Sequence, residues 1–282
     1  GFEFSATYRN RDHALKYDIS ANVSTLKNKV TSLGIGKNSY ITGAYATYVG
    51  QEIGKFYGWV YEGIARTQDE LDGHATQQGA NVGDCLYKDI SGPNGEPDGV
   101  IDAYDQTVLG SGLPKVNFGL STHMEYKGFD LNISTYGVLN YHVSDDIYNS
   151  LNSCYGYGNK EVGMLDANRW SEDGSTYLSS VPRTYAANNA TLGWNDLFSS
   201  RKIQNAAYWK IANVELGYNF PDKWFGGYVS GVRLYVSAQN LYTFTGYHGY
   251  NVDYAGGTFT PGYNFCSFPS ARTFMCGLHF TF

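Results

Sequence analysis

The sequence has few of the features that would place a chain in a common class. It contains no run of about 18 apolar residues and its mean hydropathy is negative, which excludes a membrane-spanning helix. A spanning β-barrel is not excluded, because alternating apolar and polar residues cancel in a hydropathy window. Charged residues make up only 16% of the 282 residues and the net charge is −6, which argues against nucleic acid or an anionic lipid surface as the partner.

Signals of secretion and of catalytic chemistry are also scarce. The chain opens on a strand-like segment with no basic and then apolar leader, so we expect that a signal peptide was removed or that the start of the protein lies outside this sequence. The four cysteines show no CxxC spacing, and GxSxG, HExxH and P-loop motifs do not occur. We therefore predict that the chain is no enzyme and requires no cofactor.

Strand-like alternation is what the sequence has in abundance. Gly (34) and Tyr (26) are frequent, and the clear patterns are short alternations bounded by Gly, Asn and Asp, which favour strands and turns. In the last strand-like segment the apolar side consists of Phe274, Cys276, Leu278, Phe280 and Phe282. The same one-sided pattern occurs over 15–24, 117–126, 129–134 and 212–220, with a tight turn at Lys127-Gly128.

Two architectures fit strands with one apolar side. In a soluble sandwich the apolar faces would meet each other, whereas in a membrane barrel they face lipid and the polar faces line a wet lumen. Strands of about 10 residues and aromatic residues at strand ends, such as Tyr126 and Phe129, favour the barrel. A chain ending on such a strand would have a reason to stop at Phe282, because the last strand must pair to remove the sheet edge.

The predicted strands are joined by connections of very uneven length. We expect about eight long strands, at 1–9, 14–27, 53–64, 115–126, 128–139, 206–219, 231–244 and 271–282. Long loops are predicted at 65–114, 140–205 and 245–270, and short turns at 10–13, 127–128 and 220–230. A barrel with short turns at one rim and long loops at the outward rim explains this contrast. Segment 28–52 fits it least well, because it is long on the side of the short turns.

One acidic stretch, 94–105, has the spacing of a calcium-binding loop. Its candidate oxygen ligands around a turn glycine are Asn94, Glu96, Asp98, Asp102 and Asp105. Pro97 and the aspartate at the last position depart from the pattern. A cation-free Asp-Gly turn is therefore the alternative.

Aromatic residues gather in the predicted loops 155–159, 168–170 and 243–254. They could stack on sugar rings or line a peptide path, and packing within the loops is the alternative. The candidates for a substrate-facing vestibule are Trp170, Tyr247, Tyr250 and Tyr254.

The cysteines leave the disulfide state open. Cys276 shares the apolar side of the last strand, which disfavours a bridge. Cys85, Cys154 and Cys266 lie in predicted loops, where one disulfide would leave one thiol.

Nearly the whole chain resembles the C-terminal part of a SusC/RagA-type TonB-dependent outer-membrane transporter of Bacteroidetes-like bacteria. The resemblance is carried by these segments in this order: FYGWVYEGI (56–64), GDCLYKDI (83–90), DGVIDAYDQTVLGSGLPK (98–115), NRW and PR (168–170, 182–183), YWKIANVELGYNFP (208–221), RLYVSAQNLYTFTGYHGY (233–250) and FPSARTFMCGLHFTF (268–282). Lys210 stands where the family commonly has Arg.

The resemblance implies an all-β fold: an antiparallel transmembrane β-barrel segment, about 8 strands of a 22-stranded barrel, with long extracellular loops. Residues 1–282 would be the C-terminal part of the barrel, and the plug and TonB box would lie outside this chain. The implied partners are the remaining N-terminal part of the transporter, a SusD-like surface lipoprotein, TonB through the missing part, outer-membrane lipid, and an oligosaccharide or peptide substrate. The implied location is the bacterial outer membrane.

Two further hypotheses fit the residues. A secreted, soluble carbohydrate-binding module would use the loop aromatics and a calcium turn, and it would dissolve without detergent. A passive porin-like wall would lack energy coupling, and the coupling elements that distinguish it from a driven importer would lie N-terminal to this chain.

Overall fold

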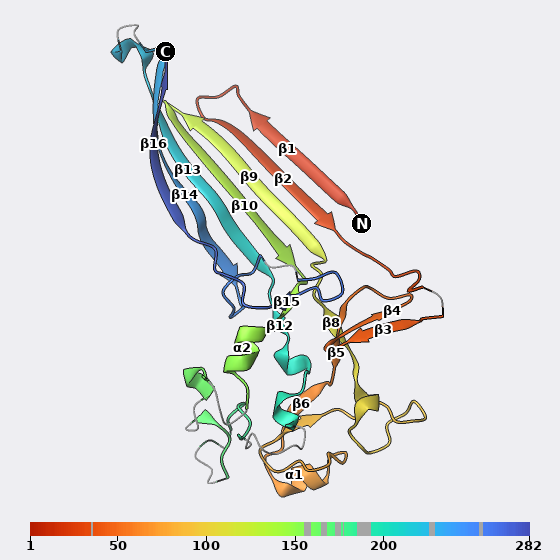
Figure 1. The fold of residues 1–282 in the computed structure, drawn as a ribbon. Coiled ribbons are helices and arrows are strands. Elements are labelled where there is room, and N and C mark those ends of the chain that lie inside the picture. Colours follow the sequence, from red (N-terminus) through yellow and green to blue (C-terminus); the bar gives the residue numbers. More distant parts are fainter. Residues whose placement is uncertain are drawn as a thin grey trace.

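The structure is a computed structural model that describes residues 1–34, 36–154, 159–164, 168–172, 176, 178–184, 193–225, 229–253 and 256–282. Seven strands in this part of the chain form one antiparallel sheet, which Figure 1 shows as a long, twisted wall. In sheet order they are β1 (Glu3–Asn10), β2 (Lys16–Thr25), β9 (Val116–Tyr126), β10 (Phe129–Leu139), β13 (Tyr208–Phe220), β14 (Gly231–Thr245) and β16 (Thr273–Thr281). Most are about as long as a strand that crosses a bilayer at a tilt.

The predicted hairpin between β9 and β10 is confirmed in detail. Tyr126 pairs with Phe129, so the turn consists of Lys127 and Gly128 alone. Both have positive φ, 49° and 88°, as the mirror-image turns that suit the right-handed twist of a hairpin require. A Cβ at Gly128 would also lie 3.0 Å from the carbonyl oxygen of Asn219, so glycine is needed here for space as well.

The register of the sheet keeps the apolar side chains of successive strands on one face. Leu131 of β10 is opposite Met124 on one side and Leu216 on the other. Leu216 is in turn opposite Val236, which is opposite Cys276. Because side chains alternate with a period of two, this register gathers the apolar phase of every strand into one continuous surface.

This apolar face is open rather than covered by other parts of the chain. Phe274, Leu278 and Phe282 are 68%, 58% and 91% exposed. A sandwich would bury these residues against a second sheet, so the structure supports the lipid-facing interpretation of the alternation.

Two bulges adjust the alternation near one end of the sheet. The register shifts at Ala212 in β13, and Asn240 in β14 takes a positive φ of 51° close by. The apolar phase predicted from Ala212 onward is therefore broken at that residue. Ile211, which is opposite Tyr242, continues the apolar face beyond the bulge.

The structure differs from the prediction of one wall strand over 53–64. This segment is split into β5 (Lys55–Gly58) and β6 (Tyr61–Ile64), which belong to two smaller sheets. Trp59 between them forms a bridge with Ser199, and its backbone N–H donates to the carbonyl of Phe198 at 3.2 Å. The segment is strand-like because it pairs, but its partners are loop segments.

This difference accounts for the poor fit of segment 28–52. Since 53–64 does not enter the wall, β2 pairs directly with β9, and residues 26–115 form a single excursion between two neighbouring strands. The excursion leaves and returns at the same end of the sheet. All of its residues therefore belong to the end that carries the long loops.

The remaining elements gather at this loop-rich end, below the wall in Figure 1. They include three small sheets, β3 (Ser39–Thr42), β4 (Tyr45–Tyr48), β5 and β8 (Thr107–Ser111); β6 and β7 (Cys85–Tyr87); and β11 (His142–Asp145), β12 (Gln204–Asn205) and β15 (Tyr263–Asn264). Two short helices, α1 (Gln68–Asp72) and α2 (Asp146–Leu151), lie with them. Within the described ranges, no helix is long and apolar enough to cross a membrane.

Candidate functional site on the polar face of the wall

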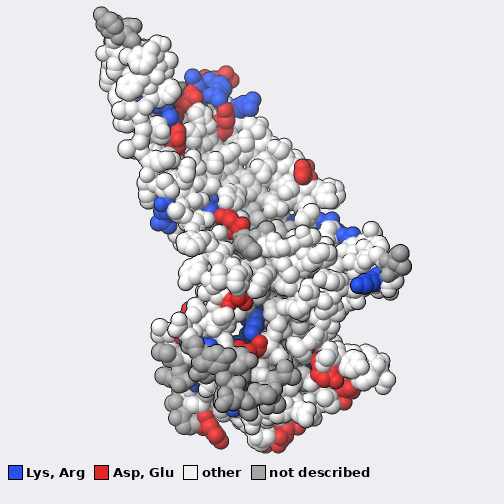
Figure 2. Space-filling model, in the orientation of Figure 1, with Lys and Arg blue, Asp and Glu red and all other residues white. Residues whose placement is uncertain are grey.

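The two ends of the wall differ from its middle in charge. Figure 2 shows most Lys, Arg, Asp and Glu of the visible face towards the short-turn end of the sheet and around the loop-rich end, with a largely uncharged surface between them. The face opposite the apolar one carries the polar phase of each strand, and we call it the polar face. Two groups of residues on it are candidates for a functional role.

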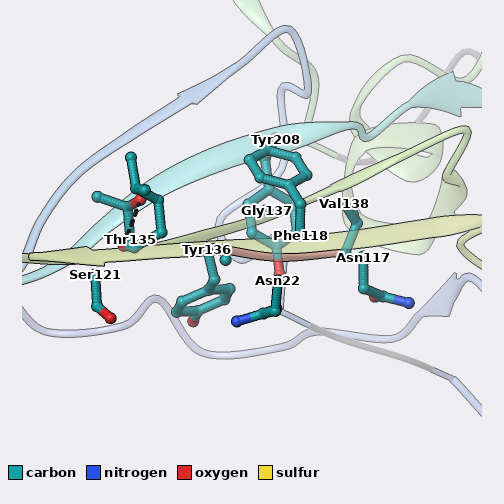
Figure 3. Close-up of a pocket in the computed structure, with 11 residues that line it drawn as sticks. Asn22, Asn117, Phe118, Ser121, Thr135, Tyr136, Gly137, Val138 and Tyr208 are labelled. Atoms are coloured by element: carbon teal, nitrogen blue, oxygen red, sulfur yellow. Dashed lines mark hydrogen bonds between the residues drawn. The ribbon is translucent and has the colours of Figure 1, made fainter. Parts of the chain in front are cut away.

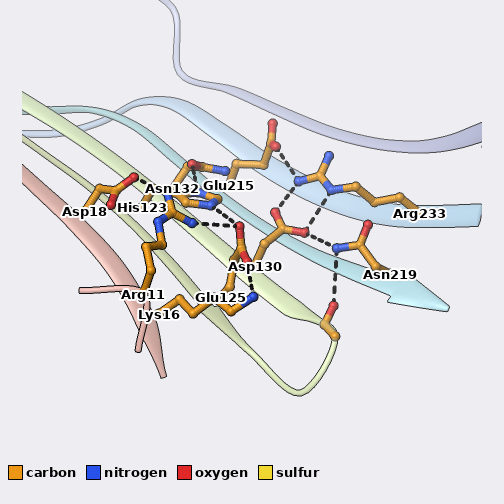
Figure 4. A network of polar contacts seen from close by, with 11 residues as sticks. Arg11, Lys16, Asp18, His123, Glu125, Asp130, Asn132, Glu215, Asn219 and Arg233 are labelled. Atoms are coloured by element: carbon orange, nitrogen blue, oxygen red, sulfur yellow. Dashed lines mark hydrogen bonds and ion pairs between the residues drawn. The ribbon is translucent and has the colours of Figure 1, made fainter. Parts of the chain in front are cut away.

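The first group, the charged belt, lies on the polar face near the short turns (Figure 4). It consists of Arg11, Lys16, Asp18, His123, Glu125, Asp130, Glu215 and Arg233. At its centre the Arg233 guanidinium donates two hydrogen bonds to the Asp130 carboxylate, one of them 2.9 Å from Nε to Oδ2, and a third to Glu215 at 2.7 Å. Asn219 also donates to Asp130, at 2.9 Å. The bidentate ion pair joins β10 to β14, and Glu215 and Asn219 connect β13 to it.

The other half of the belt joins β2, β9 and the turn before β2. His123 lies 2.9 Å from a carboxylate oxygen of Glu125 and 2.7 Å from the side-chain oxygen of Asn132. Arg11 pairs with Asp18 and approaches Glu125 at 3.6 Å. Each acidic side chain of the belt therefore has a cationic or histidine neighbour, and the belt is close to neutral as a whole.

The second group surrounds Gly119, on the same face but nearer the long loops (Figure 3). Gly119 of β9 is opposite Asn22 of β2 and Tyr136 of β10. Because Gly119 has no side chain, a hollow of about 460 Å³ remains over it, and Asn117 and Ser121 border it along β9. In Figure 3 the side chains of Asn22, Asn117, Ser121 and Tyr136 point to the same side of the sheet. We call this feature the Gly119 hollow.

A buried ion pair lies next to the hollow and ties a loop to the wall. The Lys210 ammonium of β13, whose side chain is 4% exposed, donates to Asp253 at 2.6 Å. The Tyr136 hydroxyl donates to the other oxygen of Asp253 at 3.2 Å. Removing the Asp253 carboxylate would leave the Lys210 ammonium buried without its counter-ion, so this contact holds the loop 246–253 against β10 and β13.

Of the predicted vestibule residues, Tyr247 is buried in a packed cluster. It lies with Val138, Tyr141, Val143, Ala206, Tyr208 and Val252. Its hydroxyl donates to Asp145. The Asn264 amide donates to the same carboxylate oxygen, at a distance of 2.9 Å. Burial, together with the hydrogen bond to Asp145, raises the pKa of the Tyr247 phenol well above its ordinary value. The residue thus fixes the loop after β14 onto β11.

Trp170 and Tyr250 do not belong to that cluster. Trp170 is buried and packs on Gly83, where a Cβ would lie 2.4 Å from the indole ring. Tyr250 is 62% exposed at the loop-rich end, and Tyr254 lies outside the described residues. Substrate contact by these residues stays a prediction, for which Tyr250 has the accessible surface.

In the acidic loop 94–105, the carboxylates of Asp98, Asp102 and Asp105 accept from backbone N–H groups. Asp105 is fully buried and accepts from the N–H groups of Ile90, Ser91 and Asp102, at 2.7, 3.2 and 2.8 Å. Asp102 in turn accepts from the N–H of Tyr104 at 2.7 Å, and the two aspartates form a capping box. The described ranges contain no group of three His, Cys, Asp or Glu that could hold a metal ion.

At the Asp98–Gly99 turn, Gly99 has a positive φ of 84°, the N–H of Val100 donates to Asp98 at 3.0 Å, and the N–H of Gly99 donates to Asp89 at 2.7 Å. Asn94, Glu96 and Asp98 are exposed beside it. Calcium binding by this loop stays a prediction.

All four cysteines are free thiols. Cys85 and Cys154 are buried in the loop-rich end, where their backbone N–H groups are bonded by two consecutive residues. Asn195 accepts from the backbone N–H of Cys85 at 2.7 Å, and Asp196 accepts from that of Cys154 at 3.0 Å. Burial raises the pKa of the Cys85 thiol to about 12. Cys266 and Cys276 are exposed.

The Gly119 hollow and the Lys210–Asp253 pair were not identified from the sequence. The polar phase of β9 was visible, but the order of strands was not, because 53–64 was expected between β2 and β9. A signal was present in Gly119 itself, which interrupts a run of polar residues on the polar face.

The faces of this sheet, one apolar and open and one polar and partly charged, are those of a segment of a transmembrane β-barrel wall. Comparison with known proteins agrees with that class. TonB-dependent receptor P3 of Formosa agariphila is 30% identical over 301 aligned residues, which cover 100% of this chain and 28% of the receptor. TonB-dependent receptor SusC of Bacteroides thetaiotaomicron is 25% identical, covering 94% of this chain and 24% of the receptor.

Solved structures give the same fold. The RagAB peptide transporter superposes with a TM-score of 0.77 at 21% identity, over 98% of this chain and 28% of that one. The RagAB peptide importer in its open-open state gives a TM-score of 0.74 at 20% identity, over 99% and 28%. No family model matches the chain.

Along its whole length the chain is similar to TonB-dependent receptors, SusC among them, and it spans about 28% of the length of the P3 receptor.

The central ion pair of the charged belt gives a test of the sheet's stability. Asp130→Asn leaves the Arg233 guanidinium without its bidentate acceptor, and we expect a loss of about 2 to 3 kcal/mol in the free energy of unfolding. Urea unfolding of the complete barrel in detergent measures this, with Gln239→Ala, another change on the polar face, as the control. A change below about 0.5 kcal/mol for Asp130→Asn would show that the pair does not join the strands.

Thiol labelling tests the packing of the loop-rich end. At pH 8 the buried Cys85 stays protonated because its pKa is raised to about 12, and the reactive form of a cysteine is the thiolate. We expect a water-soluble maleimide to label Cys266 in the native protein, and Cys85 and Cys154 only after unfolding, as read by peptide mass spectrometry. Native labelling of Cys85 at the rate of Cys266 would contradict the packing described above.

Proposed function

We propose that this chain is the C-terminal part of the barrel of a SusC-like importer in a bacterial outer membrane. In this proposal the complete protein takes up oligosaccharides or peptides with energy supplied through TonB. The plug and the TonB contact are contributed by the rest of the same protein. A SusD-like surface lipoprotein covers the loop-rich end.

The observation that carries the proposal is that the similarity in sequence and the two faces of the sheet point to the same class of protein. A match along the whole chain to TonB-dependent receptors falls on a sheet with one lipid-type face and one polar face. The relatives and neighbours that it matches are named as receptors and transporters, and RagAB as a peptide transporter. These names support import. The open apolar face favours a membrane barrel over a soluble binding module, in which the apolar faces would be covered.

The open edges of the sheet support the same conclusion. In the described part of the chain, β1 and β16 each pair with one neighbouring strand. A long unpaired edge attracts other strands, and in a bilayer its backbone groups would have no partner. The remaining barrel strands would supply those partners.

Uptake in the organism that carries the gene tests the proposal. Deleting the gene for the complete protein should abolish energy-dependent uptake of a labelled oligosaccharide or peptide pool, and a copy of the gene should restore it. A protonophore should also abolish uptake, since the energy reaches the outer membrane through TonB. Uptake that depends on the gene but survives the protonophore would identify a passive porin-like wall. Purification of the protein without detergent would contradict a membrane barrel.

A further inference from the structure

The polar side chains of the wall divide into those that are satisfied within the protein and those that are not. The charged side chains of the belt pair with each other, and Ser20 on β2 shares a hydrogen bond of 2.9 Å with Thr7. In contrast, Asn22, Asn117 and Ser121 have no side-chain hydrogen bond to any part of the chain that the structure describes. All three line the Gly119 hollow, which they share with Tyr136, Tyr208 and further residues of β9 and β10.

The hollow owes its shape to Gly119. The Asn22 amide lies across the glycine, since a Cβ there would come within 2.9 Å of the amide nitrogen and 3.1 Å of the oxygen. Its volume of about 460 Å³ is within the range of small-ligand pockets, about 300–1,000 Å³. A larger residue at 119 would displace the Asn22 amide and occupy part of the hollow.

Tyr136 forms one wall of the hollow and is held in place from behind. Its hydroxyl is engaged by Asp253, and its ring lies 5.9 Å from the Lys210 ammonium and 6.1 Å from the ring of Tyr208. The side chain is nevertheless 38% exposed. A fixed aromatic ring beside unpaired amides is a surface on which a sugar ring can stack while its hydroxyls bond to the amides.

The lining carries no charged side chain, which disfavours an ionic ligand. No charged side chain borders the hollow, and the nearest pair, Lys210 with Asp253, is already neutralised. A ligand carboxylate or ammonium would find no counter-ion here, so it would lose hydration without compensation.

The position of the hollow also disfavours a peptide. A peptide is commonly bound by adding a strand to a sheet edge, which needs unpaired backbone N–H and C=O groups. The hollow is formed by residues of β2, β9, β10 and β13, and each of these strands is paired on both sides. What the hollow offers is the side-chain amides of Asn22 and Asn117 and hydroxyls such as that of Ser121, which suit the paired hydroxyls of a carbohydrate.

We propose that the Gly119 hollow is a subsite for one ring of an uncharged oligosaccharide on its way through the barrel. Asn22, Asn117 and Ser121 would bond to its hydroxyls, and Tyr136 would contact its ring. This inference rests on the proposed import function and narrows its substrate to neutral glycans.

Uptake by the complete transporter with its surface lipoprotein tests the subsite. The probes are a pool of labelled neutral oligosaccharides of four to eight hexose units and a matched pool of short uncharged peptides. We expect Asn22→Ala to raise the half-saturating oligosaccharide concentration about five- to tenfold, the effect of one or two lost hydrogen bonds. Gly119→Leu, which displaces the Asn22 amide and occupies part of the hollow, should raise it at least as much.

Two control variants match these changes. Gln239→Ala removes an amide from the polar face of β14, away from the hollow, and Ser20→Ala removes a hydroxyl that is already paired. Both should leave uptake unchanged. The amount and heat-modifiable migration of each variant in the outer membrane shows whether it is assembled.

The outcomes separate the subsite from the import function. If the wild type takes up oligosaccharide and assembled Asn22→Ala and Gly119→Leu do so with unchanged half-saturation, the subsite is wrong and import stands. If only the peptide pool is imported, the glycan assignment is wrong and import again stands. If either variant instead lets small antibiotics enter passively, the substitution has loosened the plug. The hollow then contacts the plug, and the subsite is wrong. If neither pool enters the wild type in a gene-dependent manner, the proposed function fails and the subsite with it.

Discussion

Continuous pairing of backbone N–H and C=O groups across the seven-stranded sheet is the constraint on which the rest of this structure depends. In a bilayer an unpaired backbone group costs several kcal/mol, so strands can cross only as members of a sheet that pairs them on both sides. Pairing fixes the register, and the register fixes the face to which each side chain points. A slip of one residue in β9 would move Leu120 and Met124 to the polar face and His123 and Glu125 into lipid.

The polar face is built to a different rule. Near the short turns, polar groups are satisfied by their neighbours, and the Arg233–Asp130 pair lies across Gly217, where a Cβ would come within 2.6 Å of both. Near the long loops, the pairing stops and leaves accessible amides around Gly119. Two glycines on this face thus have different roles. Gly217 leaves room for the ion pair, and Gly119 leaves room beside the Asn22 amide. The loops beyond are fixed by buried polar contacts, of which Asp145 with Tyr247 and Asn264 is one.

The strands and their faces could largely be predicted from the sequence, because period-two alternation is a local signal. The turn at Lys127-Gly128 and the apolar phase of Phe274, Leu278 and Phe282 are of this kind. The order of the strands in the sheet could not be predicted, because it depends on contacts between residues far apart in the sequence. The aromatic segment 53–64 has strand composition, and whether it pairs with the wall or with loop residues such as Ser199 depends on contacts about 140 residues away.

The candidate site was less predictable for the same reason. Tyr247 and Trp170 are aromatic loop residues, which is compatible with either stacking on a ligand or packing in a cluster, and the structure shows them buried. Asn22, Asn117 and Tyr136 come from three strands and become neighbours only through the pairing of β2 with β9. Bulges are equally hard to read from sequence, since nothing in the sequence around Ala212 marks the residue that leaves the alternation.

The most direct test of this account is a site-directed spin-label scan of β9 in the complete protein, reconstituted in lipid bilayers with its native cysteines replaced by serine. Single labels are placed in turn from residue 117 to residue 124, and collision with oxygen, which concentrates in lipid, is compared with collision with a water-soluble nickel complex. The account predicts oxygen maxima at Phe118, Leu120, Thr122 and Met124, and nickel maxima at the positions between them. Accessibility without a two-residue period, or oxygen maxima at the polar positions, would contradict it.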